Sequence, residues 1–195
     1  VKLGANKVVV QGLVDGDLLA RGTRWIKEEK DYNKGIEYFS EVIELNPTYV
    51  DAYYKRAYAN LDLGNIEIAK NDLLIADSLK PNSPSILAEL AYCHYAKKEY
   101  EQGLKVAKQT LEINNNHREG NYYFGIINID LKNYEKGIPY LEKAISLGYT
   151  TGRAYHNLGV AYHHLDELEK ACLNWRIASE KNFAQSTNYL KEFCE

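Results

Sequence analysis

The chain repeats itself with a period of 34 residues. One position of this period holds Tyr32, Ile66, Tyr100, Tyr134 and Leu168. A second position holds Pro47 and, 34 residues later, Pro81. A fixed period of this length indicates a stack of similar supersecondary units rather than one irregular globule.

Each unit has the pattern of two helices. Apolar or small residues recur three and four positions apart, as in Leu87, Leu90 and Ala91, and this spacing makes one apolar face of a helix. A second run of the same kind follows after a short polar break such as residues 62–65. Helices joined by three or four residues pack antiparallel, so we predict an all-α solenoid of helix pairs.

The period divides most of the chain into five units, with a segment left over at each end. The predicted boundaries are 16–49, 50–83, 84–117, 118–151 and 152–185. Residues 1–15 stand outside the period and could be a partial helix, an extended arm or a cloning remnant; we favour a loosely held, poorly defined lead-in. Residues 186–195 restart the first-helix pattern and are expected to form a helix that caps the last unit.

The last unit carries the most complete motif. It reads Tyr155-x-x-Leu158-Gly159-x-x-Tyr162, followed by Ala171-x-x-x-Trp175. This pattern resembles the tetratricopeptide repeat family, whose signature is W-x-x-L-G-x-x-Y, then A-x-x-x-F, then P. The resemblance covers residues 16–185 and implies a right-handed superhelix that binds other proteins and has no catalytic role. The chain departs from the pattern at the proline position, which holds Asn115, Tyr149 and Phe183 in the last three units, and at Thr23, where glycine or alanine is usual.

Composition and motifs argue against several other functions. A net charge of −3 does not fit a nucleic-acid or anionic-membrane surface, and no apolar run approaches the ~20 residues of a membrane-spanning helix. The chain has no glycine-rich phosphate loop, G-x-S-x-G, H-E-x-x-H or paired C-x-x-C motif. His156, His163 and His164 share a helix side, but metal sites use closer spacing with fixed partners. We therefore predict no enzyme activity, no cofactor and no metal.

The resemblance implies a concave groove lined by the first helices of successive units. Its predicted residues are Arg21, Arg24, Lys27, Tyr54, Lys55, Tyr58, Tyr92, Tyr95, Tyr122, His156, Asn157 and His163. This list has a cationic amino-terminal end and a central row of tyrosines. Such a surface suits an extended or helical segment of another protein with acidic groups, although some tyrosines could instead fill the space between units. The alternative function is a structural homo-oligomer assembled through solenoid ends or convex faces; the sequence leaves the oligomeric state open.

The three cysteines leave two readings open. Cys93, Cys172 and Cys194 could all be reduced, buried side chains. Alternatively, Cys172 and Cys194 lie 11 residues on either side of Phe183, so on antiparallel helices they would sit at similar height and could form a disulfide. The chain has no methionine, so we expect a processed or recombinant sequence from which any targeting segment has been lost. The cytoplasm is the favoured compartment, with the bacterial periplasm as the alternative.

Overall fold

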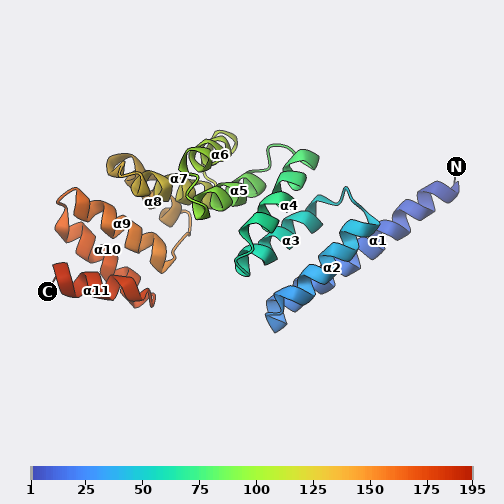
Figure 1. Cartoon of the computed structure of the whole chain (residues 1–195), viewed down its shortest axis with the longest axis horizontal. Coiled ribbons are helices and arrows are strands. Elements are labelled where there is room, and N and C mark those ends of the chain that lie inside the picture. The colour runs from blue at the N-terminus through green and yellow to red at the C-terminus, as the bar shows by residue number, and fades with distance from the viewer. Residues whose placement is uncertain (1, 195) are drawn as a thin grey trace. The chain divides into compact units, whose positions relative to one another are not determined.

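The computed structural model describes residues 2–194, and every regular element among them is a helix. The helices, in chain order, are α1 (Lys2–Arg24), the π-helical segment η1 (Trp25–Glu29), α2 (Tyr32–Leu45), α3 (Val50–Asp62), α4 (Ile66–Leu79), α5 (Pro84–Ala96), α6 (Tyr100–Ile113), α7 (Arg118–Asp130), α8 (Tyr134–Ser146), α9 (Gly152–His164), α10 (Leu168–Glu180) and α11 (Ala184–Phe193). Consecutive helices such as α3 and α4 or α7 and α8 pack as pairs (Figure 1). The predicted all-α fold of tandem helix pairs is confirmed.

Helix starts follow the 34-residue period. Val50, Pro84, Arg118 and Gly152 begin α3, α5, α7 and α9, and the second helices from α2 to α10 begin at the position shared by Tyr32 and its equivalents. The contacts divide the chain into two compact units, one ending at Ile86 and the other beginning at Leu87. Each unit is described by itself below.

The first unit is built from α1 to α4 around large side chains set against small ones. Phe39 of α2 and Leu73 of α4 are fully buried, as is Ala57 of α3. An ion pair between Arg56 and Asp72 joins α3 to α4 at 2.7 Å. Both oxygens of the Asp72 carboxylate accept a hydrogen bond from the guanidinium.

The amino-terminal segment differs from the expected lead-in. α1 begins at Lys2 and continues without a break to Arg24, so residues 2–15 are the first part of a long helix rather than a loosely held arm. Leu18 of α1 is buried against Val42 and Ala52. Residue 1 of the predicted lead-in lies outside the described residues.

The contact between α1 and α2 lies one residue earlier in α1 than the period predicts. Gly22, not Thr23, occupies the small position: a Cβ on Gly22 would lie 2.7 Å from Phe39, just as one on Gly159 would lie 2.5 Å from Trp175. The π-helical turn of η1 explains the offset, because a π turn holds one more residue than an α turn. Beyond η1, α2 begins where the period places it.

The second unit is built from α5 to α11 and has one continuous core. Leu141 of α8 packs against Gly125 of α7, and Trp175 of α10 packs against Gly159 of α9. α11 covers the end of this core, with Tyr189 4.9 Å from Trp175 between ring centroids. The predicted segment 186–195 thus falls mostly within α11, with residue 195 outside the described part.

A disulfide joins Cys172 of α10 to Cys194, the residue after α11, with their Cα atoms 5.8 Å apart. The reading in which all three cysteines are reduced therefore does not hold in this structure. Cys93 is fully buried in α5.

Candidate partner-binding surfaces

A pocket of about 390 Å³ opens in the first unit between η1 and α3. We call it the lysine–tyrosine pocket after Lys27, Lys30, Tyr54, Lys55 and Tyr58, which line it. The two tyrosines lie four residues apart on α3 and therefore share a helix face. Tyr58 is 49% exposed, and Tyr54 is half-buried.

The lysine–tyrosine pocket is cationic. Its three lysines are lined up with a single acidic residue, Asp62. The ammonium groups can bind carboxylates, while the tyrosine rings provide apolar contact area with few rotatable bonds. The site is therefore chemically suited to an acidic segment carrying an apolar or aromatic side chain.

Only part of the predicted cationic end takes part in this pocket. Lys27 and Lys55 line it, whereas Arg21 and Arg24 are absent from its lining. Arg21 pairs with Asp17 at 2.8 Å, and Arg24 pairs with Glu28 at 3.5 Å. The offset in α1 is the reason, because one residue turns a helical face by about 100°.

Lys30 is a pocket residue that sequence reasoning missed. The sequence places it in an acidic-and-basic run that reads as a solvated helix end. In the structure it is the C-cap of η1, with a φ of 56°, and it lines the pocket. The π turn that brings it there has no glycine or proline to mark it in the sequence.

A second pocket, of about 410 Å³, lies in the second unit between α5, α9 and the start of α11. We call it the arginine–asparagine pocket after Arg153 and Asn157; the predicted groove residues Tyr95 and His156 also line it. Within residues 2–194, the buried Nδ2 of Asn157 donates no hydrogen bond. An arginine beside an unused amide donor can bind a carboxylate or a peptide carbonyl.

Two predicted groove tyrosines pack inside the second unit instead. Tyr122 is 3% exposed and stacks on Tyr149, with ring centroids 4.2 Å apart. Tyr92 is half-buried against Tyr123 at 5.6 Å. Burial raises the pKa of Tyr122 well above its ordinary value. Tyr122 therefore fills the space between repeats and does not present its ring to a partner.

The predicted groove histidines mainly hold the cap helix. His156 is 7% exposed; its Nδ1 lies 2.9 Å from Ser186 Oγ of α11. Burial lowers the pKa of His156. His163 packs against Phe193 of α11, with ring centroids 4.5 Å apart. The prediction that both rings line an open groove is wrong for His163 and holds for only one edge of His156.

Among the described residues, no group of three or more histidine, cysteine, aspartate or glutamate side chains is arranged to hold a metal ion. Over the same part of the chain, no helix combines the length and the apolar character needed to cross a bilayer.

Three family models match the chain. Two are tetratricopeptide repeat models, over residues 38–71 and 152–173. The third, described as anaphase-promoting complex, cyclosome, subunit 3, matches residues 68–144.

Among curated proteins, the BBSome complex member BBS4 of Xenopus tropicalis is 26% identical over 113 residues, which are 58% of this chain. The chain spans 22% of the length of that protein. The E3 ubiquitin-protein ligase CHIP of Arabidopsis thaliana is 26% identical over 122 residues, which cover 62% of this chain and 42% of the relative.

A solved structure with a similar fold is that of YrrB, described as a TPR protein with an unusual peptide-binding site. It has a TM-score of 0.65 and 15% identity, covering 90% of each chain. The 34-residue spacing of the helix starts, the small residues where paired helices meet and the two repeat models agree. On these grounds the chain is a tetratricopeptide repeat protein.

Proposed function

We propose that the chain is a non-catalytic scaffold that binds a segment of another protein through the lysine–tyrosine pocket of its first unit. The observation that carries the proposal is the pocket itself: Lys27 and Lys55 face an opening that also exposes Tyr58. These residues occupy positions of the first helices that the repeat family uses for its ligands.

The proposed partner segment is acidic. Lysine ammonium groups outnumber carboxylates by three to one in the pocket lining, so an acidic chain gains attraction as it approaches. The arginine–asparagine pocket offers a second cationic contact, through Arg153. The names of the relatives agree with an interaction role: BBS4 is a complex member, and YrrB has a peptide-binding site.

The test compares two double charge reversals that change the net charge equally. Lys27→Glu with Lys55→Glu alters the lysine–tyrosine pocket, and Arg21→Glu with Arg24→Glu alters residues that do not line it. Proteins captured from the native source by the parent chain are identified by mass spectrometry, and peptides tiling each of them are then titrated against all three proteins. We expect the lysine variant to bind the best peptide about tenfold more weakly or worse, and the arginine variant to match the parent.

Circular dichroism first establishes that both variants are folded. Equal weakening by the two variants would mean that only net charge matters, and unchanged binding by the lysine variant would remove this pocket as the contact. If the chain captures only itself, and sedimentation shows association that rises with concentration, the homo-oligomer alternative replaces the scaffold.

A further inference from the structure

The largest of the three cavities described here lies away from both pockets above, between the second helices α6 and α8. Its volume is about 760 Å³, and α7 contributes to its lining. Leu104 and Leu111 of α6, Phe124 of α7 and Tyr140 of α8 provide apolar surface. Phe124 and Tyr140 contact each other, with ring centroids 4.5 Å apart. We call this site the α6–α8 groove.

Lysines line the α6–α8 groove on both sides. Lys105 and Lys108 come from α6, and Lys136 and Lys143 come from α8. The one acidic residue in the lining is Glu112, which lies 3.5 Å from Lys108. Across residues 2–194 the other three lysines form no ion pair. The groove therefore carries an excess of positive charge around an apolar floor.

The lysines of α8 are spread along the groove. Lys136 and Lys143 are seven residues apart, which is about two helical turns or about 10 Å. Lys136 lies over the ring of Phe124, with its Nζ 5.4 Å from the centroid. This contact places a cation directly beside the apolar floor, so that a ligand can reach both at once.

A buried amide adds a polar contact point. Asn121 lines the groove and is 1% exposed. Its Nδ2 donates to the carbonyls of Asn115 and His117, at 2.9 and 2.8 Å. Its buried Oδ1 accepts no hydrogen bond from the described part of the chain. A ligand N–H group could therefore use this acceptor.

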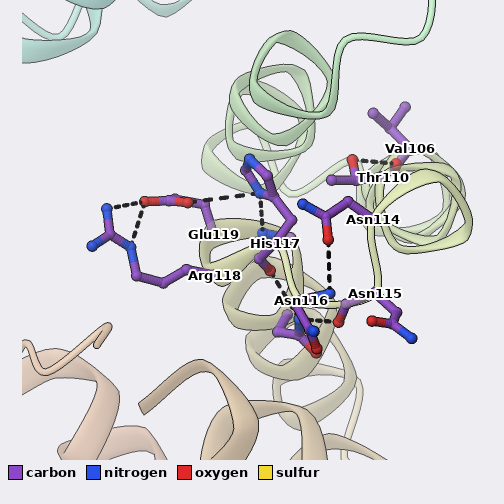
Figure 2. Close-up of polar contacts among 10 residues, drawn as sticks. Val106, Thr110, Asn114, Asn115, Asn116, His117, Arg118 and Glu119 are labelled. Atoms are coloured by element: carbon purple, nitrogen blue, oxygen red, sulfur yellow. Dashed lines mark hydrogen bonds and ion pairs between the residues drawn. The ribbon is translucent and has the colours of Figure 1, made fainter. Parts of the chain in front are cut away.

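The loop before α7 holds this amide in place. Asn115 stands where the repeat pattern has proline, in a run of three asparagines between α6 and α7. Asn116 N donates to Asn114 Oδ1 at 3.0 Å, and Gly120 N donates to His117 Nδ1 at 3.2 Å (Figure 2). These bonds fix the Asn115 and His117 carbonyls that accept from Asn121.

We propose that the α6–α8 groove binds an acidic amphipathic segment of another protein. Leucine-like or aromatic side chains of the segment lie on Leu104, Leu111, Phe124 and Tyr140, and its carboxylates pair with the lysines on the two sides. Charge complementarity points to this occupant: an apolar floor alone would suit many ligands, but four lysines beside it select an anionic one. The site is separate from the lysine–tyrosine pocket and does not depend on it.

The test uses a phage library of random 16-residue peptides selected on the intact chain. Each selected peptide is titrated by fluorescence anisotropy against the parent and against Lys136→Glu with Lys143→Glu. We expect a class of peptides whose affinity falls at least about tenfold in this variant. That class should be rich in Asp, Glu and large apolar residues, and its binding should weaken as salt concentration rises.

Two further variants make the result decisive. Lys105→Glu with Lys108→Glu changes the exposed α6 side of the groove, away from the Lys136–Phe124 contact, and should weaken the same peptides even if the α8 variant is destabilised. Lys27→Glu with Lys55→Glu changes the other unit and should leave them unaffected.

The proposal is overturned if no selected peptide is sensitive to the groove variants, or if the sensitive peptides lack acidic residues. Lysine-dependent binding of vesicles containing an anionic phospholipid, with no sensitive peptide, would also overturn it and would assign the groove to a membrane surface.

Discussion

Gly22 of α1 lies directly against Phe39 of α2: a Cβ on Gly22 would come within 2.7 Å of the Phe39 ring. The same approach recurs between Gly125 and Leu141, in the second unit. The first helix pair therefore uses the same close packing as the later ones, but from a residue one place earlier than the period predicts. This contact determines which face of α1 meets α2.

Replacing Gly22 with valine is expected to destabilise the first unit. The new side chain would overlap Phe39, which is buried and cannot move away without disturbing α3 and α4, and such overpacking costs about 1–3 kcal/mol. The loss should appear as a lower urea midpoint with an unchanged m-value.

Gly16→Ala is the matched control on the same helix. A Cβ at Gly16 meets nothing within 4 Å, so alanine should add stability through helix propensity, by about 0.5–1 kcal/mol. If Gly22→Val were as stable as the parent, Gly22 would not be the contact residue, and the assigned offset of α1 would be wrong.

The Arg56–Asp72 pair predicts a larger effect in the same unit. The Asp72 side chain is 5% exposed and accepts from Arg56 Nε and Nη2 at 2.8 and 2.7 Å. Arg56 Nη1 also donates to Ser40 Oγ of α2, at 3.0 Å. Asp72→Ala would leave the partly buried guanidinium without its counter-charge, so we expect a loss of about 3 kcal/mol in the free energy of unfolding.

Asp17→Ala is the control for that variant, because it removes an aspartate from an exposed pair. Arg21 and Asp17 are both more than half exposed, and such pairs contribute less than about 1 kcal/mol. Similar losses for Asp17→Ala and Asp72→Ala in urea unfolding would mean that burial does not distinguish the two pairs.

Periodicity predicted the helices well because each helix pair repeats the same packing problem. It failed in α1 because a π turn adds a residue, and Trp25–Glu29 contains no glycine or proline to signal it. Counting from the amino end of a repeat therefore placed Arg21 and Arg24 on the wrong face. The α6–α8 groove was missed because its lysines occupy ordinary exposed positions of second helices.

Depth was the other part that spacing could not supply. Tyr122 and His156 occupy the same position of successive repeats, and each is covered by the aromatic residue that replaces the repeat proline. Tyr149 stacks on Tyr122 at 4.2 Å, and Phe183 lies 5.0 Å from His156. In the second repeat, where Pro81 is retained, the equivalent Tyr54 stays in its pocket lining. The departures from proline were the signal available in the sequence.

Stability of the second unit should fall as the pH is lowered through the histidine range. Burial lowers the pKa of His156 below its ordinary value of 6.5, so below that pH the unfolded chain binds a proton that the folded chain does not. Folding is therefore fully favoured above about pH 6.5 and loses stability as the pH falls towards the folded-state pKa. Urea midpoints measured from about pH 8 to about pH 5 should decline in this direction.

Two variants identify the histidine responsible. His156→Gln cannot take up a proton and should reduce the pH dependence, while His164→Gln, at an exposed ring stacked on Tyr134, should keep it. His117, whose pKa is also lowered by burial, would contribute the part that remains. An unchanged slope in His156→Gln would show that His156 is not the titrating group.

The Cys172–Cys194 disulfide should stabilise the docking of α11 on the second unit. The bridge closes a loop between cysteines 22 residues apart, and bridges over loops of this size typically contribute about 2–4 kcal/mol by restricting the unfolded chain. Replacing both cysteines with serine should lower the melting temperature of the second unit. In parallel, a thiol assay in denaturant should count one thiol before reduction, from Cys93, and three after it.

Reductant provides the internal control for this bridge, because it acts on the parent without any change of sequence. Adding dithiothreitol should lower the melting temperature of the parent to that of the Cys172→Ser, Cys194→Ser variant, and should leave the variant unchanged. Because Trp175 packs against Tyr189 and Phe193, loosening of α11 should also shift tryptophan fluorescence to longer wavelength. Three thiols in the untreated protein, or a parent that melts at the same temperature with and without reductant, would show that packing alone holds α11 in place.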